Sequence, residues 1–167
     1  ITTLYTQNGA EKIGNKRLNR AVSDVAEAVY NRTPIINHEL ITRHNITAQT
    51  SKARNIILDD IFHSRQFEQY STGTSAESTI YRACLGITKE DENLSLVRSE
   101  ITEFIHESKG KKNVFASLVN KLTKAPYGMR RGVLPVYIAE QIMQLEDLRV
   151  FFHDNSEIAL CPKLIVD

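Results

Sequence analysis

The chain has 167 residues, of which 41% are hydrophobic and 25% charged, and its formal net charge is +1 at pH 7. These values are typical of a folded globular protein and exclude a disordered or collagen-like chain. The longest nearly unbroken apolar run, 133–139, is far shorter than the roughly 18 residues of a membrane-spanning helix, so we expect a cytoplasmic protein without a membrane partner. Because it begins at Ile1 and shows no signal pattern, we expect a fragment of a longer chain.

Residues 1–63 predict a β-hairpin followed by a helix-turn-helix-like unit. Asn8-Gly9 is a type I′ turn signal between two short strands. Apolar residues at three- and four-residue spacing predict an amphipathic helix over 16–30, with an apolar face formed by Leu18, Val22, Val25 and Val29.

Two further helices complete this unit. Asn37 is placed to cap a short helix over 39–42, and Thr47 is placed to cap a longer helix that ends at Phe62. The longer helix offers four polar side chains for contacts with DNA bases or phosphates, namely Gln49, Thr50, Lys52 and Arg54.

Residues 64–110 predict a helical connector. Thr74 and Glu77 have the spacing of a capping box, and the helix that follows them ends at Gly86. A second helix with an acidic outer face is expected over about 93–108. The segments between these helices, 64–75 and 86–92, are predicted to be linkers.

Residues 111–167 predict a winged-helix-like unit. Asn113 is placed to cap one helix, Pro135 suits the first turn of the next, and a strand, turn and strand follow over 149–160. The first of these helices and the loop 124–132 offer side chains for nucleic-acid or protein contacts, namely Lys121, Lys124, Tyr127, Arg130 and Arg131. Tyr127 alternatively packs against its own domain. The whole chain is thus predicted to be mainly α with short β-hairpins, either as these three units or as one compact domain.

The charges are distributed unevenly along the chain. Residues 109–132 carry seven basic side chains and no acidic one, whereas 55–108 and 133–167 are acidic. A basic block of this kind attracts phosphate groups or an acidic protein surface. It is also compatible with a solvated helix face followed by a polar loop, and both interpretations stay open.

The sequence contains no recognisable catalytic or metal-binding motif. The phosphate-binding, dinucleotide-binding and nucleophilic-serine patterns are absent, and the histidines lack the spacing of metal ligands. Cys84 and Cys161 form no CxxC pair, and Cys84 falls on an apolar helix face where a buried structural thiol is expected. We therefore predict a chain without enzymatic activity, metal or cofactor.

Three strings in the sequence resemble a known family. They are YNRTPIINHELITR at 30–43, STIYR at 78–82, and APYGMRRGVLPV at 125–136 followed by VFFHDNSE at 150–157. In this order they resemble the region beyond the nucleotide-binding core of large bacterial P-loop ATPases from phage-defence systems of the BREX type. Met129 stands where that family usually has leucine.

The resemblance implies a non-catalytic accessory domain of a multidomain phage-defence ATPase. The charged residues supply the candidate partners, which are other domains or subunits of the defence complex, or double-stranded DNA. In one hypothesis the helix after Thr47 enters the major groove, although Asp59 and Asp60 near its end disfavour a continuous DNA-facing helix. In the other, the basic loop meets an acidic surface of a neighbouring domain, subunit or partner protein. A stand-alone winged-helix DNA-binding transcription regulator is a further alternative.

Overall fold

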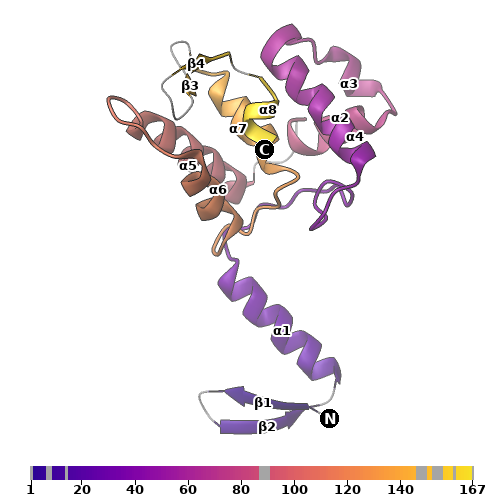
Figure 1. The fold of residues 1–167 in the computed structure, drawn as a ribbon. Helices are drawn as coiled ribbons and strands as arrows, with labels where there is room; N and C mark the ends of the chain where they lie inside the picture. The colour runs from indigo at the N-terminus through magenta and orange to yellow at the C-terminus, as the bar shows by residue number, and fades with distance from the viewer. Residues whose placement is uncertain are drawn as a thin grey trace.

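The chain folds into an N-terminal arm and a helical body (Figure 1). The computed structural model describes residues 2–6, 9–13, 15–86, 91–145, 150–151, 156–159 and 161–166. It is mainly helical, as predicted. The arm consists of strands β1 (Thr2–Thr6) and β2 (Gly9–Ile13) and helix α1 (Asn15–Val29). The body contains α2 (Ala48–Asp59), the π-helical turn η1 (Asp60–Ser64), α3 (Glu68–Thr72), α4 (Ala76–Cys84), α5 (Glu92–Glu107), α6 (Phe115–Thr123), α7 (Leu134–Ile142), β3 (Val150–Phe151), β4 (Glu157–Ile158) and α8 (Lys163–Val166).

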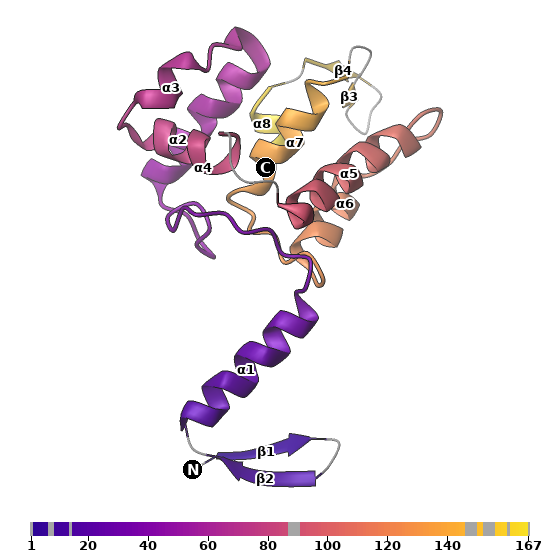
Figure 2. The same ribbon diagram turned by 180° about the vertical axis from the view of Figure 1, so that it is seen from behind.

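The arm projects from the body, and both views show α1 extending away from the other helices (Figures 1 and 2). The hairpin is antiparallel and pairs Thr2 with Ile13 and Thr6 with Gly9, while the predicted turn residue Asn8 lies outside the described residues. The predicted helix over 16–30 is confirmed as α1. Its apolar face is uncovered, since the exposed fractions of Val22, Val25 and Val29 are 59%, 63% and 46%.

An irregular segment, 30–47, connects the arm to the body. The backbone N–H of Arg32 donates to the carbonyl of Pro126 at 3.1 Å, and that of Ile35 donates to Oδ2 of Asp91 at 2.7 Å. The helix predicted over 39–42 is wrong. The chain forms a single turn there, in which the N–H and hydroxyl of Thr42 both donate to the carbonyl of His38, so the first helix of the predicted helix-turn-helix is missing.

The start of α2 is confirmed and the start of α4 is shifted. Thr47 caps α2 by accepting a hydrogen bond from the N–H of Thr50. Ser75, rather than the predicted Thr74, caps α4 by accepting from the N–H of Ser78. The predicted linker 64–75 contains the short helix α3, and the linker 86–92 falls partly outside the described residues.

Helices α5 and α6 differ in how they begin. Asp91 caps α5, and its Oδ1 accepts hydrogen bonds from the N–H groups of Asn93 and Leu94. The cap predicted at Asn113 is wrong, because α6 begins after Val114 without a side-chain cap. Pro135 lies in the first turn of α7, as predicted. The strands β3 and β4 pair antiparallel, while the predicted turn at 153–156 lies, except for Ser156, outside the described residues.

Helix α7 lies inside the body. Eight of its nine residues are buried, and it packs against α2, α5, α8 and the π-helical turn. The guanidinium of Arg98 on α5 donates to both carboxylate oxygens of Glu140 on α7, at 2.8 and 2.9 Å, and lies over the ring of Tyr137. A bidentate pair of this kind fixes the relative position of the two helices.

One hydrophobic core holds the body together. Its buried members extend along the chain from Ile41 to Ile142, and therefore come from all three units predicted from the sequence. Ile57, Ile101 and Leu122 are each 0% exposed. Burying a side chain of this size stabilises a fold by about 1.5–3 kcal/mol. No helix in the described part of the chain is both long and apolar enough to span a bilayer.

Candidate partner-binding site

The four residues predicted on α2 differ in their exposure to solvent. Gln49 and Lys52 are exposed, whereas Thr50 and Arg54 are each only 4% exposed. The hydroxyl of Thr50 lies 2.9 Å from that of its capping residue Thr47. Thr50 and Arg54 were expected to be open to DNA, and the structure corrects that placement.

Arg54 has a structural role inside the body. Its Nη1 donates to the carbonyl of Gly132 at 3.4 Å, and its Nη2 donates to Oγ of Ser51 at 3.2 Å. A Cβ at Gly132 would lie 2.6 Å from the carbonyl oxygen of Ile41, so only glycine permits this close approach. Arg54 therefore joins α2 to the loop that precedes α7.

Five side chains from three parts of the chain meet around a pocket of about 560 Å³, which we call the basic pocket. Three of the five are cations, on the segment after α1, at the end of α6 and in the following loop, and the other two are a carboxylate and a phenol. These residues are Arg32, Glu100, Lys121, Lys124 and Tyr127. Lys121, Lys124 and Tyr127 are among the site residues predicted from the sequence.

Glu100 organises the inner wall of the basic pocket. Its Oε1 accepts a hydrogen bond of 2.6 Å from the hydroxyl of Tyr127, and its Oε2 forms an ion pair with Nζ of Lys121. Tyr127 is thereby buried against its own domain, which is the alternative that the sequence left open. It is therefore not exposed for insertion into a partner.

Electrostatics at Glu100 favour its ionised form. Burial raises the pKa of the Glu100 carboxyl, but the hydrogen bonds from Lys121 and Tyr127, together with the nearby charges of Lys121 and Arg32, outweigh burial and hold the pKa below its ordinary 4.5. The hydrogen bond to Glu100 in turn raises the pKa of Lys121. The pair therefore stays charged at neutral pH.

The basic pocket has an excess of positive charge. Three cations, Arg32, Lys121 and Lys124, face one carboxylate, and Arg32 and Lys124 are both exposed. An arginine guanidinium binds carboxylate or phosphate oxygens in a bidentate manner, and a lysine adds a point charge. The pocket is therefore chemically suited to an anionic group.

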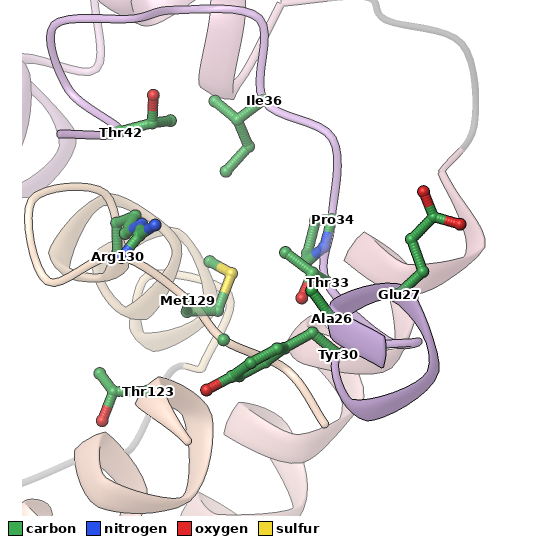
Figure 3. A pocket seen from close by; sticks show the side chains of 11 residues that line it. Ala26, Glu27, Tyr30, Thr33, Pro34, Ile36, Thr42, Thr123, Met129 and Arg130 are labelled. Carbon is green, nitrogen blue, oxygen red and sulfur yellow. The ribbon is translucent and has the colours of Figure 1, made fainter. Parts of the chain in front are cut away.

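A second concavity, of about 570 Å³, is lined in part by Thr123 at the end of α6 and by residues 128–130 of the following loop; we call it the apolar cavity (Figure 3). Its walls include Tyr30, Pro34, Ile36 and Met129. Arg130 and Glu27 lie on opposite sides of it (Figure 3).

Gly128 allows the loop to pass close to the segment after α1, beside this cavity. Its φ is +58°, and a Cβ there would lie 2.7 Å from the ring of Tyr30. The last two predicted residues, Arg130 and Arg131, are exposed, and Arg130 lines the apolar cavity. The loop thus presents cations while its backbone is held against the segment after α1.

The thiol of Cys84, which the sequence predicts to be structural, lies inside the body. Cys84 is 1% exposed, and burial raises the pKa of its thiol to about 12, so the thiol is protonated at neutral pH. Within the described ranges, no three or more histidine, cysteine, aspartate or glutamate side chains are grouped so that they could hold a metal ion.

No protein-family model, curated protein or solved structure matches this chain.

Arg32 and Glu100 were not predicted to be site residues from the sequence. Arg32 is a single basic residue two positions before Pro34, and Glu100 is one of several acids on the outer face of a predicted helix. Neither has a local signal that distinguishes it from an ordinary surface charge. The approach of the segment after α1 to the loop after α6, through the hydrogen bond from Arg32 to Pro126, brings the two together.

Proposed function

We propose that this chain is a non-catalytic interaction domain of a multidomain phage-defence ATPase, located in the cytoplasm, and that its basic pocket binds an acidic surface of a neighbouring domain, subunit or partner protein. The observation that carries the proposal is the convergence of Arg32, Lys121 and Lys124 around one concave site. The phage-defence assignment rests on the resemblance of the three sequence strings.

Sequence-specific DNA recognition has less support. A winged-helix or helix-turn-helix protein inserts an exposed helix into the major groove. Helix α7 is buried, no helix precedes α2 over 39–42, and α2 has only Gln49 and Lys52 exposed among its four predicted contacts. These features disfavour the stand-alone transcription regulator as well. Contact with DNA phosphates through Lys124, Arg130 and Arg131 is retained as an outcome of the test.

Binding of a fluorescein-labelled poly-glutamate peptide and of a mixed-sequence DNA duplex, measured by fluorescence anisotropy at about 50 and 200 mM salt, tests the proposal. We expect the peptide to bind at low salt and the double variant Arg32→Glu/Lys124→Glu to lose at least about tenfold in affinity. The matched control is Lys109→Glu/Lys111→Glu, which changes net charge equally at exposed positions of the loop before α6. We expect this control to retain more affinity than the pocket variant.

Two results would overturn the proposal. Absence of peptide binding at low salt, with duplex DNA bound and lost in the pocket variant, would replace the acidic protein partner with a phosphate backbone. Equal losses in the pocket variant and the matched control would show that general positive charge, rather than the basic pocket, attracts the peptide.

A further inference from the structure

The two concavities share a single loop as their common wall. Thr123 lines the apolar cavity and the next residue, Lys124, lines the basic pocket. The same alternation recurs in the middle of the loop, where Tyr127 lines the basic pocket and Gly128 the apolar cavity. A ligand that crosses the loop between these points would therefore contact both sites.

The apolar cavity has the composition of a site for a side chain. Tyr30, Pro34, Ile36 and Met129 supply aromatic, aliphatic and thioether surface (Figure 3). A cavity of about 570 Å³ lies within the size range of ligand sites, roughly 300–1,000 Å³, and is large enough for a bulky apolar side chain. Methionine adapts its shape to different apolar ligands.

The polar groups around the apolar cavity indicate which kinds of residue would lie next to an apolar side chain bound in it. Arg130 lies at one side, its neighbour Arg131 is exposed, and Glu27 lies at the opposite side (Figure 3). A carboxylate is attracted toward Arg130 and repelled from Glu27. Within the part of the chain described by the structure, the buried Oγ1 of Thr33 has no hydrogen-bond partner, and a peptide N–H entering the cavity beside it would provide one.

We propose that the apolar cavity and the basic pocket together bind one peptide segment of a partner protein, in which a large apolar residue is flanked by acidic residues. The apolar side chain fills the cavity, and the acidic residues lie along the loop 124–131 toward Arg130 and the basic pocket. This inference rests on the proposed function and specifies the partner chemistry. A small apolar molecule would occupy only the cavity and would leave the cations of the basic pocket unused.

A set of short fluorescein-labelled peptides tests this inference. The peptides have Asp and Glu flanks around one central residue, which is Phe, Leu or Ser, and a further peptide has Lys flanks around Phe. By fluorescence anisotropy at about 50 mM salt, we expect the acidic Phe and Leu peptides to bind at least about fivefold more tightly than the acidic Ser peptide, because only they bury apolar surface. The Lys-flanked peptide is expected to bind more weakly than all three.

Substitutions on α1 test whether the apolar side chain of the peptide binds in the apolar cavity. Ala26 is exposed and lines the apolar cavity, whereas Ala28 is exposed on the same helix and does not line it. We expect Ala26→Phe to fill the cavity and reduce affinity for the acidic Phe peptide by about tenfold, and Ala28→Phe to leave it within about twofold. Both variants carry the same loss of helix propensity, and circular dichroism verifies that both are folded.

The outcomes separate this inference from the proposed function. Equal binding of the acidic Ser and Phe peptides would overturn the apolar anchor and leave an acidic partner in place. Equal effects of Ala26→Phe and Ala28→Phe would exclude the apolar cavity as the site of the anchor. Failure of every acidic peptide to bind would overturn both, and tighter binding of a DNA duplex than of any peptide would favour a nucleic-acid partner.

Discussion

Helices α1 and α7 have apolar residues of similar size in very different surroundings. In the arm, Val25 on α1 is 63% exposed, whereas Val136 on α7 is 0% exposed. Helix α7 packs against several elements of the body, while α1 is surrounded by solvent for most of its length (Figures 1 and 2). The comparison shows that an apolar periodicity identifies a helix face without establishing that the same chain covers it.

Hydrogen bonds help to hold the segment after α1 against the body. Asp91 accepts from the backbone of Ile35 and also caps α5, and the side chain of Asn93 donates to the carbonyl of Thr33 at 3.3 Å. These hydrogen bonds place Arg32 beside the loop after α6 without burying α1. The binding site that we propose therefore lies where the arm meets the body.

Truncation in the body should have the largest effect on stability. Leu122 is 0% exposed and belongs to the core. We expect Leu122→Ala to lower the free energy of unfolding by about 2–5 kcal/mol, through lost apolar burial and the cavity left behind. Urea denaturation followed by circular dichroism measures this change. A loss below about 1 kcal/mol would contradict a single well-packed core.

Removal of the Asp91 hydrogen bonds between the segment after α1 and the body should have an intermediate effect on stability. Asp91→Ala removes the cap of α5 and the acceptor of the Ile35 N–H, so we expect a loss of about 1–2 kcal/mol. Hydrogen exchange should accelerate at the amides of Ile35, Asn93 and Leu94. Unchanged exchange at Ile35 would show that Asp91 does not hold the segment after α1 against the body.

Substitution of Glu100 in the basic pocket should have a smaller effect on stability, and this effect should depend on pH. The folded-state pKa of Glu100 is depressed, so its contribution to stability is present above the ordinary pKa of 4.5 and is lost as pH falls through the lower folded value. We expect Glu100→Gln to cost about 1 kcal/mol or less at pH 7 and to weaken the acid dependence below pH 4.5. Urea titrations of both proteins from neutral to acid pH measure the difference. Parallel pH profiles would contradict the role of Glu100.

Substitutions in the arm should have the smallest effect on stability. Val25→Ala removes an exposed side chain and introduces a better helix former, so we expect a change in unfolding free energy within about 0.5 kcal/mol. The same denaturation experiment as for Leu122→Ala allows direct comparison. A loss above about 1 kcal/mol would show that the apolar face of α1 is covered in solution and would remove the contrast between arm and body.

Much of the local structure could be predicted from the sequence. The apolar spacing of α1, the cap at Thr47 and Pro135 in the first turn of α7 depend on residues within one or two helical turns, and all three are confirmed. The misplaced caps at Asn113 and Thr74 show the limit of this reasoning. A suitable side chain was present in each case, but the chain begins its helix one residue later.

The candidate site was predicted only in part. Lys121, Lys124 and Tyr127 belong to a local basic pattern, but Arg32 and Glu100 join them through contacts between distant segments. Arg54 shows the opposite case, because a basic residue on a helix predicts a surface position, yet the approach of Gly132 places it inside.

The sequence by itself determined the helical class of this protein, the positions of most helices and the concentration of basic residues around the loop 124–132. These properties depend on backbone preference, apolar spacing and charge along neighbouring residues. Only the tertiary structure decided that α7 is internal, that the apolar face of α1 is uncovered, and that Arg32 meets Lys124. Burial and charge convergence are set by which distant surfaces pack together, and that packing depends on contacts that no local window of sequence contains.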